Sequence, residues 1–163
     1  MPTQRRWGRM NEPDVVIEEN NHRQISIMDI RDKFARLAEQ LVKDGEKEKA
    51  QEVIKKVVEL TPNDKLPYDY SMLPVVSALY SCGLTAEAEK ISVEMTNDYQ
   101  KIIVWLQNLQ KDGFSENREY GMSVSVLGYL GREAMINGAT QTAEYIDKVY
   151  SSILGVGIEE SLK

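Results

Sequence analysis

The feature that most constrains the fold of this chain is a glycine followed five residues later by an alanine. It occurs three times, as Gly45/Ala50, Gly83/Ala88 and Gly138/Ala143. Apolar residues recur four, eight and eleven positions before each glycine, which is the spacing of one face of a helix. A glycine can take the left-handed conformation that ends such a helix, and an alanine lets the next helix cross closely. The pattern therefore predicts three helical hairpins.

Helix–turn–helix units of this kind are typical of tetratricopeptide repeats. The first copy fits the repeat best, with first-helix core positions at Phe34, Leu37, Ala38 and Leu41. Both intervals between the glycines exceed the usual ~34 residues, so we expect two insertions. We predict an all-α fold, a right-handed stack of about three tetratricopeptide-like hairpins with an inserted helix.

The first insertion is "TPNDKLPYDY" at 61–70. Pro62 and Pro67 end one helix and hold the backbone extended before the next, so this stretch is predicted to join two repeats. We expect Tyr68 and Tyr70 to pack on neighbouring helices, with their hydroxyls near polar partners.

The second insertion is "TNDYQKIIVWLQNLQKDG" at 96–113. It is either a separate helix or the continuation of a helix that begins near Thr85, and Gly113 ends it. Its predicted inward-facing stripe consists of Ile102, Ile103, Trp105, Leu106 and Leu109.

The chain length fits a single domain. Residues 1–25 lack a helical period, and we expect an extended segment that packs on the repeats through Trp7, Val15 and Ile17. Residues 26–154 form the predicted helical domain, which a helix near 139–154 closes. Residues 155–163 are expected to fray.

Composition excludes several classes of function. The net charge of −6 argues against nucleic-acid binding, which needs a clustered basic face. With Cys82 as the one cysteine and His22 as the one histidine, neither an internal disulfide nor a Cys/His zinc site can form. We interpret Cys82 as a small core residue and the polar run 18–22 as a solvated turn rather than a metal or sugar site. No apolar run approaches the ~18 residues of a membrane span.

Catalytic motifs are absent from the sequence: it has no glycine-rich phosphate loop and no nucleophile or metalloprotease signature. The 26 acidic residues are dispersed, so no carboxylate pair stands out. We therefore predict no catalytic residue, no cofactor and no metal. The remaining candidate is the groove that stacked hairpins create. First-helix positions not used within each pair would face it, and the main ones are Asp32, Glu39, Lys43, Tyr70, Ser77, Tyr80 and Arg132. Ala35, Val42, Leu73 and Met135 share this register. In the alternative, the inserted helix fills the groove.

Two runs carry a more specific pattern. The first holds Trp-Gly-x-Met-Asn, an acidic-Asn element and Phe-Ala-Arg-Leu-Ala, and the second holds Pro-Tyr-Asp-Tyr. They resemble the C-terminal soluble region of a bacterial family of multi-spanning membrane proteins of unknown function, related to eukaryotic transmembrane protein O-mannosyltransferases. The resemblance covers about residues 5–100, with Glu19 where Asp is more usual. The matching structural element consists of Trp7, Gly8, Asn11, Arg23, Pro67, Tyr68 and Asp69.

The resemblance implies a helical-repeat tail behind a hydrophobic catalytic part, so the glycosyltransferase chemistry would belong to a larger parent protein. This chain would be a non-catalytic interaction module, tethered to the membrane, whose partner is its own membrane domain, an acceptor protein or a peptide. The implied location is the extracytoplasmic, periplasm-like face, with the cytoplasmic face as an alternative. The alternative function is a free-standing soluble scaffold that binds a peptide or a partner helix.

Overall fold

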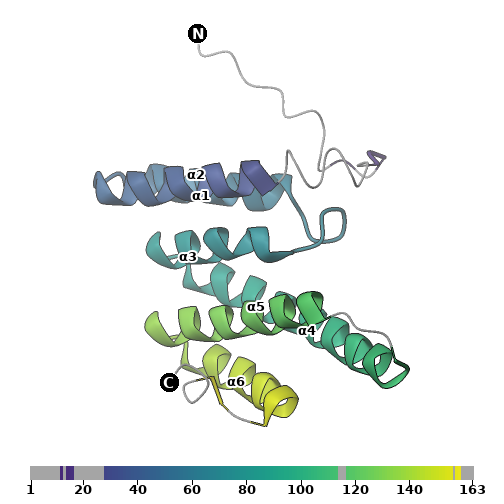
Figure 1. The fold of residues 1–163 in the computed structure, drawn as a ribbon. Coiled ribbons are helices and arrows are strands. Elements are labelled where there is room, and N and C mark those ends of the chain that lie inside the picture. The colour runs from purple at the N-terminus through teal and green to yellow at the C-terminus, as the bar shows by residue number, and fades with distance from the viewer. Residues whose placement is uncertain (1–11, 13, 17–27, 114–116, 156, 159–163) are drawn as a thin grey trace. The chain divides into compact units, whose positions relative to one another are not determined.

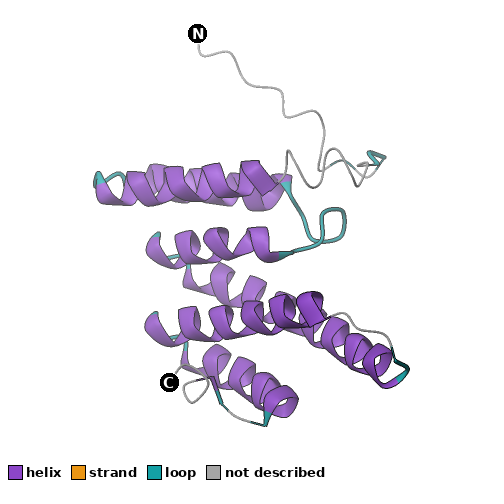
Figure 2. Cartoon of the chain, in the orientation of Figure 1, coloured by secondary structure: helices purple, strands orange, loops and turns teal. Residues whose placement is uncertain are grey.

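The computed structural model describes residues 12, 14–16, 28–113, 117–155 and 157–158. Within these ranges the chain forms six α-helices and one short 3-10 helix, and the described residues contain no strand (Figure 2). The predicted all-α class is confirmed. The tetratricopeptide-like, right-handed stacking of hairpins stays a prediction.

The chain divides into two compact units, Met1–Leu84 and Thr85–Lys163. We had expected one helical domain over 26–154. The two helices of the second predicted hairpin fall on either side of this division.

The first unit contains α1 (Met28–Lys43), α2 (Lys47–Leu60), the 3-10 helix η2 (Tyr70–Met72) and α3 (Leu73–Ser81). α1 packs against both α2 and α3 (Figure 1). Gly45 lies between α1 and α2 with φ +80°, as the turn prediction requires. Pro74 lies in the first turn of α3, where its missing N–H leaves no helical hydrogen bond unmade.

The buried line of α1 differs from the predicted one. It consists of Arg31, Ala35 and Ala38, spaced four and three residues apart. Leu37 was expected in the core but is 49% exposed, whereas Ala35 was expected to face the groove and is fully buried. Both predictions were wrong because α1 packs on two helices at once, and small side chains at this line let both approach closely.

The second unit contains α4 (Thr85–Lys111), α5 (Asn117–Ile136) and α6 (Thr140–Leu154). α4 packs on α5 and α6, which also pack on each other. The second insertion is thus the continuation of the helix that begins at Thr85, one of the two expected alternatives. Gly113 and Gly138 follow α4 and α5 with φ +89° and +72°, and α6 is the expected closing helix.

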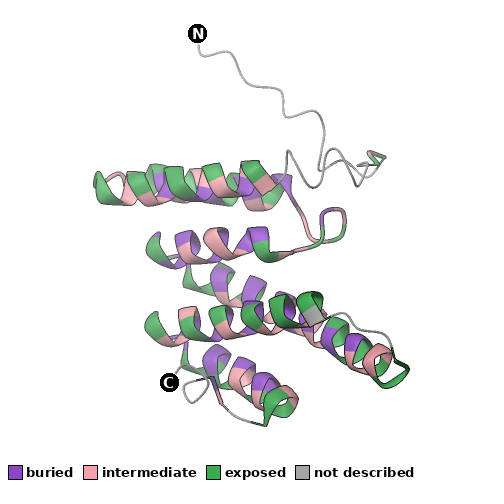
Figure 3. Cartoon of the chain, viewed as in Figure 1, coloured by how far each residue is buried: buried purple, intermediate pink, exposed green. Residues whose placement is uncertain are grey.

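Buried residues recur every three or four positions along α4 and continue on α5 and α6 (Figure 3). Along α4 the largest of them are Ile91, Met95, Tyr99, Ile103 and Leu106. None of the helices in the described part of the chain combines the length and apolar character that crossing a membrane requires.

The predictions for the two ends of the chain can be compared with the structure at only a few residues. Val15 is half-buried, while Trp7 and Ile17 lie outside the described residues. At the other end, Ile158 does not fray as we expected for 155–163, because it is buried and its N–H donates to Asp147 Oδ1 at 2.8 Å.

Candidate functional site

A buried arginine organises the joint between α2 and α3, which we define as residues 61–72. Arg31 comes from the first turn of α1 and is only 2% exposed. A guanidinium group removed from water must have its N–H groups paired, because an unpaired buried charge is strongly unfavourable. The residues of the joint supply those partners.

The strongest contacts of Arg31 are two. Nη2 donates to the carbonyl of Leu66 at 2.8 Å, and Nη1 donates to Ser71 Oγ at 3.1 Å. Longer contacts of 3.4–3.5 Å reach Thr61 Oγ1, the carbonyls of Thr61 and Pro67, and Asp69 Oδ1. The guanidinium carbon also lies 5.6 Å from the centre of the Tyr68 ring, within cation–π range. Arg31 therefore fixes both ends of the joint to α1.

The Asp69 carboxylate links the Arg31 guanidinium to the local backbone. Its Oδ1 accepts the N–H of Ser71 at 2.9 Å, which caps η2, and the same oxygen accepts the Ser71 hydroxyl. Asn63 Oδ1 accepts the Tyr68 N–H at 2.8 Å and closes the other half of the loop. The joint is thus a folded structural element, in which the Asp69 carboxylate is paired with Arg31 and with Ser71.

Three residues of the predicted family element, Pro67, Tyr68 and Asp69, contact Arg31. Trp7, Gly8, Asn11 and Arg23 lie outside the described residues. Sequence reasoning missed Arg31 itself. A usable signal was the position of Arg31, four residues before Ala35 and seven before Ala38. These spacings place it on the same side of the helix as the two alanines.

The predicted partner-binding residues are divided between the units. Six lie in the first unit, on α1, η2 and α3, and Arg132 lies on α5 in the second. Lys43, Tyr70 and Arg132 are exposed, and Asp32, Glu39 and Ser77 are half-buried. Tyr80 is only 6% exposed, so it does not line an open surface. Among the described residues, the partner of the Tyr70 hydroxyl is Met28 Sδ at 3.8 Å, a sulfur and not the oxygen or nitrogen that we expected.

The second unit carries an exposed apolar surface that sequence reasoning missed. Trp105, Val104 and Ile102 are 60%, 48% and 38% exposed, although Trp105 and Ile102 were predicted to face inward. Ile103 and Leu106 are buried as expected. The signal was the run "IIVWL" at 102–106, because five consecutive apolar residues encircle a helix and one packed face cannot cover them all.

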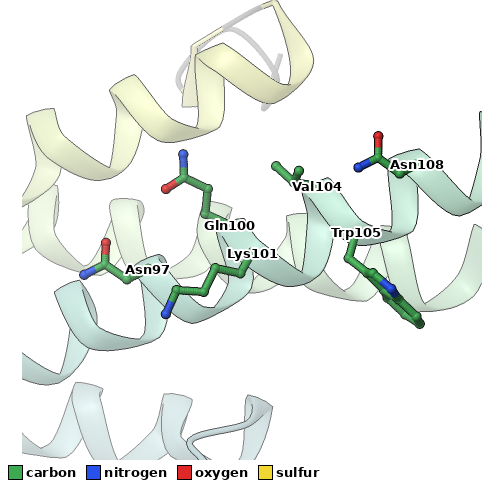
Figure 4. A pocket seen from close by; sticks show the side chains of 6 residues that line it. All are labelled: Asn97, Gln100, Lys101, Val104, Trp105 and Asn108. Carbon is green, nitrogen blue, oxygen red and sulfur yellow. The ribbon is translucent and has the colours of Figure 1, made fainter.

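A hollow of about 620 Å³ lies along this part of α4. The residues that line it are spaced three and four apart on α4, and we call them the α4 face: Asn97, Gln100, Lys101, Val104, Trp105 and Asn108. Figure 4 shows these side chains projecting from α4, with Trp105 extending away from the helix axis. Because a single helix supplies the whole lining, the hollow is an open face and not an enclosed chamber.

The α4 face is nearly neutral. Lys101 Nζ pairs with Asp98 Oδ1 at 3.0 Å, and Asn97 Oδ1 accepts the Tyr145 hydroxyl of α6 at 2.6 Å. The other polar members, Gln100 and Asn108, carry carboxamides, which both donate and accept hydrogen bonds. The chemistry available here is apolar contact flanked by uncharged hydrogen-bonding groups.

Cys82 is a fully buried core residue, as predicted. Burial raises the pKa of its thiol; Lys47 works against this shift and Glu39 adds to it. Its carbonyl accepts a hydrogen bond from Gln51 Nε2 at 2.9 Å. A buried thiol with a raised pKa is a poor nucleophile at neutral pH.

Metal-ligating side chains do not gather in the described part of the chain, where no three His, Cys, Asp or Glu residues lie close enough to hold an ion. The polar run 18–22 lies outside the described residues. No protein-family model, curated protein or solved structure matches this chain. The resemblance to the membrane-protein family therefore stays a prediction.

Proposed function

We propose that this chain is a non-catalytic helical interaction module that binds a protein partner through the α4 face. The observation that carries the proposal is the exposure of Trp105 and Val104 on a helix whose opposite face is buried. Exposed clusters of large apolar side chains mark interaction surfaces. Tryptophan is the residue type most enriched among those that dominate protein–protein binding energy.

The composition of the face defines the kind of partner. Since Lys101 is paired with Asp98, the face carries no net positive charge to attract a nucleic acid or an acidic peptide. A partner surface of apolar side chains, bordered by uncharged hydrogen-bonding groups, matches Trp105, Val104 and the carboxamides of Gln100 and Asn108.

The wider context of the proposal rests on the family resemblance. In that context the chain is the tail of a membrane-embedded, glycosyltransferase-like parent, and the partner is the parent's own membrane domain or an acceptor protein. The extracytoplasmic side is the proposed location. A free-standing soluble scaffold is the alternative, and it uses the same α4 face.

Substitution of Trp105 separates binding from folding. We expect Trp105→Ala to weaken partner capture at least about tenfold, because truncating a central interface tryptophan costs 2 kcal/mol or more. The thermal midpoint should hardly change, because the side chain is mostly exposed. Tyr129→Ala is the matched control, an exposed aromatic residue on α5, and it should keep full capture. Equal losses in both variants, or a collapse of stability with Trp105→Ala, would count against the α4 face.

The size and cellular location of the native polypeptide test the proposal that this chain is the tail of a larger membrane protein. An antibody against this chain is used to blot soluble and membrane fractions of the source cells. A membrane-pellet band far above 18.6 kDa is expected for the tethered tail. A soluble band near 18.6 kDa would overturn the membrane parent and leave the free-standing scaffold.

A further inference from the structure

The α4 face has a half-buried polar end and an exposed apolar end. Asn97 and Gln100 are half-buried at the first end, whereas Val104 and Trp105 are exposed at the second. Val104 follows Asn97 by two turns of the helix, which places the two ends about 10 Å apart along α4. A partner that uses the whole face must therefore satisfy two different chemistries at that separation.

Tyr145 of α6 fixes the direction of the Asn97 carboxamide. The Tyr145 hydroxyl donates to Asn97 Oδ1, and the two oxygens are 2.6 Å apart. A separation this short is typical of an O–H···O contact rather than an N–H···O contact, so the carboxamide oxygen is the atom that faces Tyr145. In Figure 4 the Asn97 oxygen points toward the yellow ribbon of α6, and the nitrogen points to another side. The tyrosine thus leaves Nδ2, which can only donate, for other contacts.

Two asparagines of the α4 face therefore differ in what they offer. Within the described part of the chain, neither Asn97 Nδ2 nor the Asn108 carboxamide has a hydrogen-bond partner. The Asn108 carboxamide is exposed and can turn to present either its donors or its acceptor. Asn97 is held with its donors outward, so the half-buried end of the face selects a hydrogen-bond acceptor.

Building on the function proposed for this face, we propose that Tyr145 is a positioning residue that makes the α4 face bind an extended segment of a partner protein. A backbone carbonyl of that segment accepts from Asn97 Nδ2, and an apolar side chain packs on Val104 and Trp105. Carbonyls inside a helix are used by the helix itself, whereas those of an extended segment are free to accept. In an extended chain the ~10 Å between the two ends corresponds to about three residues.

Side-chain NMR signals of the full chain test the orientation. The probe is N,N-dimethylacetamide, whose carbonyl accepts hydrogen bonds and which has no N–H to donate. The Asn97 NH2 signals should shift with a midpoint at least about twofold lower than those of Asn108, because the competent orientation of Asn97 is always populated. Tyr145→Phe should abolish this difference, and Tyr129→Phe on α5, the matched control, should preserve it. Equal midpoints in the unmodified chain, or a difference that survives Tyr145→Phe, overturns the positioning role.

The extended occupant is tested with the blocked peptide acetyl-Ala-Ala-Leu-amide, and acetyl-Ala-Ala-Ala-amide is its control. The leucine peptide should shift the Asn97 NH2 signals and the Trp105 indole N–H signal with one shared midpoint. That midpoint should be at least about threefold lower than the control peptide's, because leucine adds apolar contact. Different midpoints at the two residues, or no saturation by roughly 100 mM peptide, overturns the extended occupant. Both titrations are independent of partner capture, so their failure is distinguishable from a failure of the Trp105→Ala test.

Discussion

Two segments outside α1–α6 are fastened to helices by opposite chemistry. The joint at 61–72 wraps around the buried guanidinium of Arg31, which reaches several of its carbonyls and side chains. At residues 157–158, the aliphatic side chain of Ile158 is buried and its N–H donates to Asp147. The polar anchor depends on directional contacts that few side chains can reproduce. The apolar anchor depends mainly on how well the volume of the Ile158 side chain fills the space beside Gly131.

The largest expected effect is the loss of the polar anchor. Arg31→Leu should lower the free energy of unfolding by about 3–5 kcal/mol, because it leaves Asp69 and several carbonyls without their partner. Urea unfolding followed by circular dichroism measures the change. Arg36→Leu is the control on the same helix, because its exposed pair with Asp32 should contribute no more than about 0.5 kcal/mol. A loss below 1 kcal/mol for Arg31→Leu would contradict its role in holding the joint.

The shape of the guanidinium sharpens this test. Arg31→Lys keeps the charge but cannot span Leu66, Ser71 and Thr61 with one ammonium group, so we expect it to lose about 2 kcal/mol or more. The same urea titration measures the loss. Full stability in Arg31→Lys would show that charge alone holds the joint.

Loss of the apolar anchor should have a smaller effect. Ile158→Ala should lower the free energy of unfolding by about 2 kcal/mol, because it removes a buried aliphatic side chain at the edge of the second unit. Ile136→Ala on α5 is the matched control, and its exposed side chain should leave stability within about 0.5 kcal/mol. Equal effects from the two isoleucines would mean that Ile158 is not held in solution.

Cys82 reports on the first unit alone. We expect its thiol to react slowly with disulfide reagents at neutral pH because burial shields it and raises its pKa, so that labelling requires opening. Arg31→Leu should accelerate labelling by roughly a hundredfold or more, in proportion to the stability it removes. Ile158→Ala lies in the other compact unit and should change the rate less than about threefold. A large acceleration by Ile158→Ala would show that the two units open together.

The sequence predicted the turns better than it predicted the faces between them. Gly45, Gly113 and Gly138 end helices as expected because a left-handed residue is a local requirement. The faces of α1 and α4 were misassigned at Leu37 and Trp105 because burial depends on which helices pack there, and periodicity does not contain that information. An alanine on the buried line of α1 carries little hydrophobic signal, although Ala35 and Ala38 are both fully buried.

Sequence reasoning missed the roles of Arg31 and Ile158 for a related reason. Arg31 is charged, and single-sequence reasoning places charges in solvent unless a partner set is visible; its partners lie 30–40 residues away in the joint. Ile158 lies in a short glycine-rich segment whose composition favours fraying. The space that its side chain fills exists because Gly131 has no side chain. Neither the set of partners around Arg31 nor the space for Ile158 can be recognised before the three-dimensional fold is known.

The central claim, that the α4 face binds a protein, is tested most directly by site-specific photo-crosslinking in the source cells. A photoreactive residue at Asn108 lies within the α4 face, and one at Lys90 lies on the same helix outside it, and both sites are exposed. We predict one discrete adduct from position 108, none from position 90, and loss of the adduct when Trp105→Ala is added. Equal adducts from both positions, or an adduct at 108 that persists without Trp105, would contradict the claim.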